Sequence, residues 1–541
     1  MSKKDSFVKG TIILAAAALV ARVLGIFQRV PLEHLFDDVG DAAFSQANNV
    51  YLMLLTLATA GIPSTLSKMV SERYALNRPD EARQVYRAAL IFGAVAGVII
   101  SAALYITAPL FAKHAGVPES TLAIRAIAPA LLLFPTIAMM RGYSQGRNNM
   151  MANGISQIVE QIARVMTAIL LAFLLLHQGY GNPVMAAGAS FGSVFGSIGA
   201  FAIMLYAAIK MKRSDKQSGI QASSEAKLPL LGIYKDIFSL SIPIILSSMT
   251  IQAVYFIDSS LIVPLLSGQV GVPEATRQLA ILGQKAQSIA GIPPVLAIAL
   301  STSLIPVISA AYARRDEEHL KRQITLAMRI AILTGTPIVL SLVVAAYSVN
   351  GLLFTSPSGS GMIALLTLGT IFQITMTTSN SILLGMGKSR ISMFYVLAGI
   401  IVKLAASVLL SRFMGIYGII IATALCFIVI TALNLRLLRT IVPFEIMGKR
   451  WRGYLLAVLV SGAAGYGLNE AGISLAGMMP ARLAYLIACL AAGAAVVILY
   501  LVMLIVLGVL SAQELASYPR PVRRLLSPLM KLQPSRMRER E

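Results

Sequence analysis

The chain has 541 residues, of which 57% are hydrophobic and only 13% are charged, and its formal net charge is +22. Soluble domains carry about 25% charged residues, so this composition excludes a soluble protein and predicts an all-α protein that crosses a membrane many times. The excess of Lys and Arg matches the bias of cytoplasmic loops that face anionic lipid, and it requires no nucleic-acid partner. The two cysteines and four histidines form neither a disulfide framework nor a metal-ligand pattern, so we expect no metal and no cofactor.

Fourteen apolar runs come close to the roughly 20 residues that a helix needs to cross a bilayer, and we predict fourteen transmembrane helices. The first run lacks a signal-peptide cleavage site and is expected to stay in the membrane. Most Lys and Arg residues lie in alternate connections and in the terminal segments, which predicts that both termini are cytoplasmic. The runs are centred near Leu19, Leu54, Val98, Leu132, Ala168, Ser197, Gln252, Ile298, Leu340, Gln373, Gly399, Ala424, Val460 and Val496.

The first apolar span contains two arginines, Arg22 and Arg29. They lie seven residues apart, about two turns, so both side chains point to the same side of one helix. A charge at the bilayer centre costs about 3 kcal/mol or more, and it normally faces a wet cavity or a partner. Because a guanidinium group binds phosphate through two parallel hydrogen bonds, the pair predicts a membrane-buried site for an anion such as a phosphate. The alternative interpretation is that Arg29 snorkels to the outer interface beside Pro31.

The first outer connection is acidic, and it holds Glu33, His34, Asp37, Asp38 and Asp41. Membrane glycosyltransferases use outer-loop acids of this kind with a metal or a sugar. The alternative interpretation is a solvated acidic turn, since no second acidic or His-rich outer loop accompanies it.

The fifth span carries a polar stripe made of Ser156, Gln157, Glu160, Gln161 and Arg164. Spacings of three and four residues place these side chains on one helix face, which must point to the protein interior or to water. One interpretation is a structural pair between Glu160 and Arg164. The other is that Arg164 adds to a cationic cavity, with Glu160, Gln157 and Gln161 as polar or ion-coupling groups.

Three further charged residues lie in or beside later spans. Asp258 in the seventh span either couples transport to an ion or lies near the outer water. Lys285 opens the eighth span, and Lys403 lies in the middle of the eleventh without a local acid, so we expect both lysines to face the cavity. With Arg22, Arg29 and Arg164 they form the predicted substrate site.

A polar, Ser-rich segment follows the sixth span and predicts a linker between two halves. We expect an N-terminal lobe of helices 1–6 at residues 1–211 and a cytoplasmic linker at 212–234. A C-terminal lobe of helices 7–12 then covers residues 235–440, with helices 13–14 at 441–512. Residues 513–541 form a basic cytoplasmic tail. Internal repeats with a site between them are the usual plan of transporters.

Three segments resemble a known family. Arg141–Val165, RGYSQGRNNMMANGISQIVEQIARV, is similar to the span 4–5 signature of the SpoVB/YtgP group of polysaccharide exporters. Ala21–Arg29 resembles the first-helix motif of the related MurJ lipid II flippases, in which two arginines face the central cavity, and Ala60–Arg73 resembles their span 2 exit. The group belongs to the multidrug/oligosaccharidyl-lipid/polysaccharide (MOP) flippase superfamily.

The resemblance implies a MATE-like fold with two pseudo-symmetric six-helix lobes and two additional C-terminal helices. It implies a transporter rather than an enzyme: a monomeric flippase for an undecaprenyl-diphosphate-linked precursor, most simply lipid II, in the bacterial cytoplasmic membrane. Its partners are then the lipid-linked oligosaccharide and membrane lipids, with a coupling cation or the membrane potential as an open alternative for the driving force. The competing hypotheses are a cation-coupled multidrug exporter on the same fold and a membrane-embedded glycosyltransferase. The sequence leaves open a teichoic, capsular or spore-wall precursor as the substrate.

Overall fold

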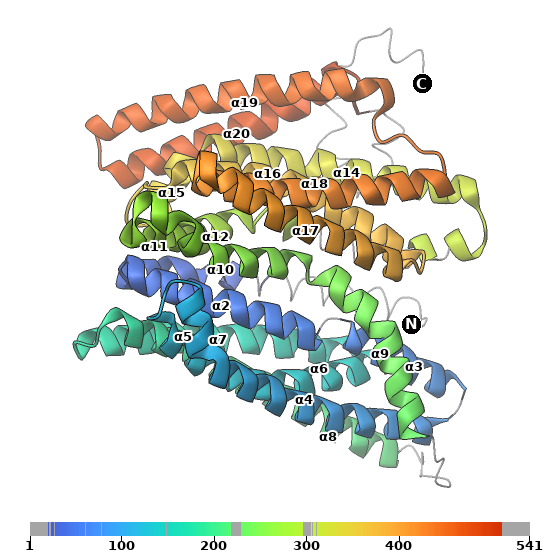
Figure 1. The fold of residues 1–541 in the computed structure, drawn as a ribbon. Helices are drawn as coiled ribbons and strands as arrows, with labels where there is room; N and C mark the ends of the chain where they lie inside the picture. The colour runs from blue at the N-terminus through green and yellow to red at the C-terminus, as the bar shows by residue number, and fades with distance from the viewer. Residues whose placement is uncertain are drawn as a thin grey trace. The chain divides into compact units, whose positions relative to one another are not determined.

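The chain is helical throughout the part that the computed structural model describes. Every regular element there is a helix and no strand occurs, which confirms the predicted all-α class (Figure 1). The described part comprises residues 20–510 apart from positions 21, 22, 26, 60, 77, 148, 218–228, 296–304, 306 and 310.

The chain divides into two compact units. Unit 1 comprises Met1–Ser288 and Gly387–Ile430, and unit 2 comprises Ile289–Met386 and Thr431–Glu541. In unit 1, α9 (Leu230–Ser248) packs against α3 (Ile62–Ala75), so a helix that follows the linker shares a compact unit with the N-terminal helices. The division of the chain into lobes at 212–234 stays a prediction.

Unit 1 contains the helices that build the candidate site. Residues 27–35 form a helical segment that precedes the labelled elements. The others are α2 (Asp38–Thr59), α3, α4 (Pro79–His114), α5 (Ser120–Ile127), α6 (Ala130–Gly146), α7 (Met150–His177), α8 (Asn182–Gln217), α9, α10 (Thr250–Val270), α11 (Val272–Ala280), η1 (Ile281–Ala286), the start of α12 (Gln287–Ala290), α17 (Ser389–Met414) and most of α18 (Ile416–Ile441).

The described part of unit 2 is built around four long helices, with three short ones between them in the chain. Its buried interior includes a hydrogen bond of 2.7 Å between the hydroxyl groups of Thr336 and Tyr454, which joins α14 to α19. The helices are α14 (Glu317–Val344), α15 (Ala346–Leu353), α16 (Ser360–Gly385), η2 (Gly448–Arg450), α19 (Trp451–Ser474), η3 (Leu475–Gly477) and α20 (Ala481–Val506).

Eleven helical stretches among the described residues are long and apolar enough to cross a membrane, and each covers the centre of one predicted span. The predicted centres Leu19 and Ile298 lie outside the described residues. Val460 lies in α19, a helix of 24 residues that is not among the eleven. The structure therefore supports a polytopic membrane protein, and the total of fourteen spans stays a prediction.

Close contact between α7 and α8 fixes the orientation of the polar stripe. A Cβ atom on Gly192 would lie 2.8 Å from the carbonyl oxygen of Arg164, and one on Gly196 would lie 2.8 Å from that of Glu160. Such separations are too short for any side chain larger than hydrogen. Glycine at these two positions of α8 therefore lets α7 pack against it backbone to backbone, with Glu160 and Arg164 buried in the interior of unit 1.

Candidate functional site

A polar cavity of about 360 Å³ lies within unit 1. Its wall carries three arginines and one carboxylate, together with five side-chain amides that can donate and accept hydrogen bonds. The lining residues are Gly25, Gln28, Arg29, Phe44, Asn48, Leu52, Arg141, Gln157, Glu160, Gln161, Arg164, Gln287 and Ser288. Five of the nine residues predicted for the site are among them.

Arg164 is the most buried of the three arginines that line this cavity. Its guanidinium carbon lies 5.0 Å from the centre of the Tyr51 ring, and Nη2 donates a hydrogen bond of 2.5 Å to the Tyr51 hydroxyl group. The residue is only 8% exposed, and its Nε has no hydrogen-bond partner among the described residues. No described carboxylate lies within 4.0 Å of it, so Arg164 keeps a positive charge that is available to an anion in the cavity.

Glu160 pairs with Arg141, and this corrects the predicted pair between Glu160 and Arg164. Arg141 Nη2 lies 2.8 Å from Glu160 Oε2, and the same nitrogen donates a bond of 2.8 Å to Ser156 Oγ. The reason is that α6 packs against α7 and brings a guanidinium group from outside the stripe to the carboxylate. The sequence prediction missed Arg141 as a site residue, although it is the first residue of the segment 141–165.

Arg29 lines the cavity and also contacts η1. Its Nη1 donates hydrogen bonds to the carbonyl oxygen of Gly283 and to Ser288 Oγ, the latter at 3.3 Å. Arg29 therefore does not simply snorkel to an interface; it belongs to the cavity wall. Arg22, its predicted companion, lies outside the described residues.

Lys403 and Asp258 lie outside the cavity lining and bind each other. Lys403 is fully buried, and its ammonium group donates to Asp258 Oδ1 and, at 2.9 Å, to the carbonyl oxygen of Ile419. Asp258 also accepts a hydrogen bond of 3.3 Å from Thr423 Oγ1. The prediction that Lys403 faces the cavity is therefore wrong in this structure, because a buried ammonium group binds an acid from another helix.

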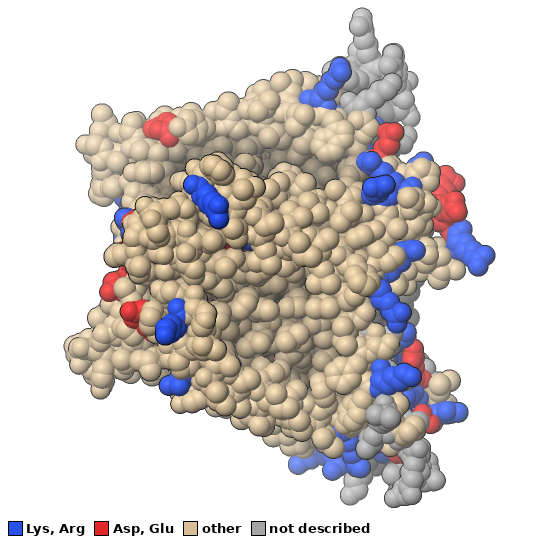
Figure 2. All heavy atoms as spheres, viewed as in Figure 1, with Lys and Arg blue, Asp and Glu red and all other residues tan. Residues whose placement is uncertain are grey.

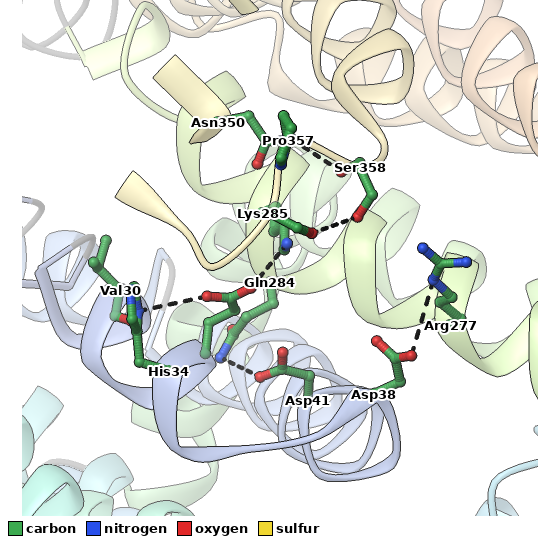
Figure 3. Close-up of polar contacts among 12 residues, drawn as sticks. Val30, His34, Asp38, Asp41, Arg277, Gln284, Lys285, Asn350, Pro357 and Ser358 are labelled. Atoms are coloured by element: carbon green, nitrogen blue, oxygen red, sulfur yellow. Dashed lines mark hydrogen bonds and ion pairs between the residues drawn. The ribbon is translucent and has the colours of Figure 1, made fainter. Parts of the chain in front are cut away.

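Lys285 also lies outside the lining, in a set of polar contacts with the acidic connection (Figure 3). Its Nζ lies 2.8 Å from Glu33 Oε1, and both side chains are buried. Gln284 Nε2 donates a bond of 3.2 Å to the buried Asp41, while Asp38 lies at 3.9 Å from Arg277 at the surface. The connection is thus not a solvated acidic turn, and its two buried carboxylates already have protein partners.

Comparison with known proteins agrees with the resemblance read from the sequence. The family described as polysaccharide biosynthesis protein matches residues 7–312, more than half of the chain. The chain belongs to this family. Among curated relatives from Bacillus subtilis, it is 26% identical to the lipid II flippase MurJ over 85% of each chain. It is 24% identical to stage V sporulation protein B over 95% of this chain and 98% of the relative.

Solved structures support the fold. A structure of the lipid II flippase MurJ in an inward closed conformation matches 91% of this chain and 98% of its own, with a TM-score of 0.66 and 14% identity. An inward-facing MATE multidrug transporter of the MOP superfamily matches 80% and 97%, with a TM-score of 0.64 and 15% identity. The protein is therefore a membrane protein with the fold of MOP-superfamily transporters, related to MurJ and to the sporulation protein.

Proposed function

We propose that this protein is a flippase that carries an undecaprenyl-diphosphate-linked cell-wall precursor, most simply lipid II, across the bacterial cytoplasmic membrane by alternating access. The observation that supports it is the charge of the cavity wall, which carries three arginines, Arg29, Arg141 and Arg164, and a single carboxylate, Glu160. A diphosphate carries the negative charge that balances this excess of cations, and guanidinium groups bind phosphate oxygens through two parallel hydrogen bonds.

The rest of the cavity wall suits the polar part of such a substrate. The five amides offer paired donors and acceptors, which is the pattern that sugar hydroxyl groups require, and Phe44 and Leu52 add an apolar surface. A cavity of about 360 Å³ holds a diphosphate with its adjoining sugar, while the lipid tail stays in the bilayer.

A multidrug exporter of the same fold is the weaker candidate. A site for cationic drugs needs a surplus of carboxylates, since like charges in a water-excluded site repel. In this cavity the lining cations outnumber the one carboxylate, and that carboxylate is bound to Arg141. The charge therefore favours an anionic ligand.

Replacement of a depleted lipid II flippase is the direct test of the proposal. Expression of this chain in bacteria depleted of their own flippase is expected to restore growth and to move labelled lipid II to the outer leaflet. A chain that is present in the membrane at normal amounts, yet restores neither growth nor lipid II movement, would exclude lipid II as the substrate.

We further propose that both termini and the linker at 212–234 face the cytoplasm. Figure 2 shows Lys and Arg gathered at the end of unit 1 where α3 meets α4, the end that the positive-inside rule assigns to the cytoplasm. In a chain without Cys426 and Cys489, an impermeant thiol reagent added to intact cells is expected to miss cysteines introduced at 212–217. It should label one introduced at Ser358, and labelling at 212–217 would reverse the topology.

A further inference from the structure

The π-helical turn η1 binds the cavity-lining Arg29 and also Glu33 and Asp41 of the acidic connection, although the proposed function uses only the cavity. All six of its residues are buried, and π-helical turns inside α-helical segments are frequent at functional sites. Two residues of the helical segment 27–35 bind this region: Arg29 binds Gly283 and Ser288, and Glu33 binds Lys285. Arg29 and Glu33 lie four residues apart, so both project from one face of that segment.

We call the contacts of Arg29 with Gly283 and Ser288, together with the pair Glu33–Lys285, the η1 latch. Arg29 is the only member of this set that is both a cavity-lining cation and a partner of η1. A phosphate offers a guanidinium group full negative charge and two parallel hydrogen bonds, neither of which a single carbonyl or hydroxyl oxygen provides. An anion in the cavity therefore competes with Gly283 and Ser288 for Arg29.

We propose that the η1 latch blocks access to the cavity from the α11 end of unit 1. We propose further that a diphosphate in the cavity weakens these contacts, because it competes with η1 for Arg29. The inference rests on the proposed function for the identity of the anion, whereas the latch itself does not depend on the substrate. Gly283 and Ser288 act as positioning residues for Arg29, and the pair Glu33–Lys285 holds the segment 27–35 against η1 when the cavity is empty.

The packing of η1 against α2 makes the turn sensitive to small changes. A Cβ atom on Gly283 would lie 1.7 Å from Ser45 Oγ and 2.7 Å from Ser45 Cβ. The turn therefore cannot accept a side chain at position 283 without moving away from α2. Glycine at position 45 would remove both obstructing atoms, which offers a compensating change.

The latch is tested by the accessibility of the cavity from outside the cell. In a chain without Cys426 and Cys489, Asn48→Cys places a reporter thiol in the cavity wall, and an impermeant maleimide is added to intact cells. Lys285→Met and Glu33→Gln are each expected to raise the labelling rate about tenfold, because they remove one partner of a buried pair. The charge exchange Glu33→Lys with Lys285→Glu should return the rate toward its starting value.

Two controls define the result. Arg277→Gln removes an ion pair at the same end of unit 1, but both partners are about half exposed, so the labelling rate should not change. Val272→Cys, at the exposed start of α11, must be labelled in cells, since it reports that this end faces outside. An unchanged rate in Lys285→Met, with normal amounts of protein, would overturn the latch.

Gly283→Ala gives an independent variant. It is expected to raise labelling at Asn48→Cys as Lys285→Met does, and the added change Ser45→Gly should lower the rate again. If Gly283→Ala is labelled at the original rate, η1 does not hold this end closed.

The link to the diphosphate is measured separately, on purified protein in lipid nanodiscs. Spin labels at His34 and Val272 report the separation between the segment 27–35 and α11 by electron–electron resonance. Undecaprenyl diphosphate is expected to lengthen this distance in the otherwise unaltered chain and to leave it unchanged in Arg29→Gln. No response to the diphosphate in either chain would overturn the link through Arg29. Failure of complementation together with faster labelling of the latch variants would instead leave the latch in place and remove the proposed substrate.

Discussion

Replacement of Arg164 by alanine is expected to abolish transport of a diphosphate-linked lipid while the amount of protein in the membrane stays normal. Arg164 is buried at the cavity wall, where its guanidinium group lies over the Tyr51 ring and binds the Tyr51 hydroxyl group, and its Nε has no hydrogen-bond partner in the described part of the chain. Loss of a buried charge-assisted contact weakens binding by roughly 2–5 kcal/mol. Folding should be spared, because the change removes a buried charge rather than the partner of one.

Arg164→Lys separates geometry from charge. The ammonium group keeps the charge but loses the fork, so lipid movement should fall well below that of the unaltered chain without reaching zero. The matched control is Arg125→Ala, since Arg125 makes the same kind of contact with Tyr105 at 5.1 Å but lies outside the cavity lining. The readout is complementation in a flippase-depleted strain with membrane protein quantified alongside. Full complementation by Arg164→Ala would contradict the anion site.

The polar stripe of α7 is the part of the site that sequence spacing predicted best. Helical periodicity is local: residues three and four apart share a face whatever surrounds them. Hence Gln157, Glu160, Gln161 and Arg164 could be grouped from the sequence, and the structure places all four in one cavity wall. Whether they bind substrate stays a prediction.

The partners of the charged residues could not be predicted in the same way. Arg141 lies 19 residues before Glu160, and Asp258 lies 145 residues before Lys403, so neither pair shares a helix. Such contacts depend on how helices pack, which apolar patterns do not determine. The same limit applies to the acidic connection, for which a solvated turn is one of two interpretations of the sequence: its partners Gln284 and Lys285 come from η1, more than 240 residues later.

The all-α class could be predicted from composition. In a bilayer every backbone polar group must be hydrogen-bonded within the protein, so long apolar runs form helices. The positions at which helices break were harder to predict from the sequence. The predicted seventh span, centred near Gln252, is in the structure a pair of helices, α9 and α10, that meet at Met249. Pro243 inside α9 marks this region in the sequence, but a proline alone does not say where a helix ends.

Breaking the pair Asp258–Lys403 is expected to have the largest effect on stability. Lys403→Met keeps the length of the side chain but leaves Asp258 buried without its cation, and such a loss costs about 3–5 kcal/mol. Asp258→Asn should be similarly harmful, since it leaves the buried ammonium group without a carboxylate partner, while the bond to the Ile419 carbonyl oxygen remains. Both variants should show lower membrane levels and a lower thermal unfolding midpoint in detergent.

The double variant Lys403→Met with Asp258→Asn distinguishes a structural pair from a transport site. Removing both charges is far milder than removing one, so the unfolding midpoint of the double variant should lie above that of either single variant. Arg277→Gln, which breaks an exposed pair with Asp38, is the control and should leave the midpoint nearly unchanged. If the pair is structural, a double variant that folds should also transport, because neither residue lines the cavity. Stable single variants that fail to transport would instead assign Lys403 and Asp258 to the transport cycle, and the charge balance of the cavity would then be only part of the mechanism.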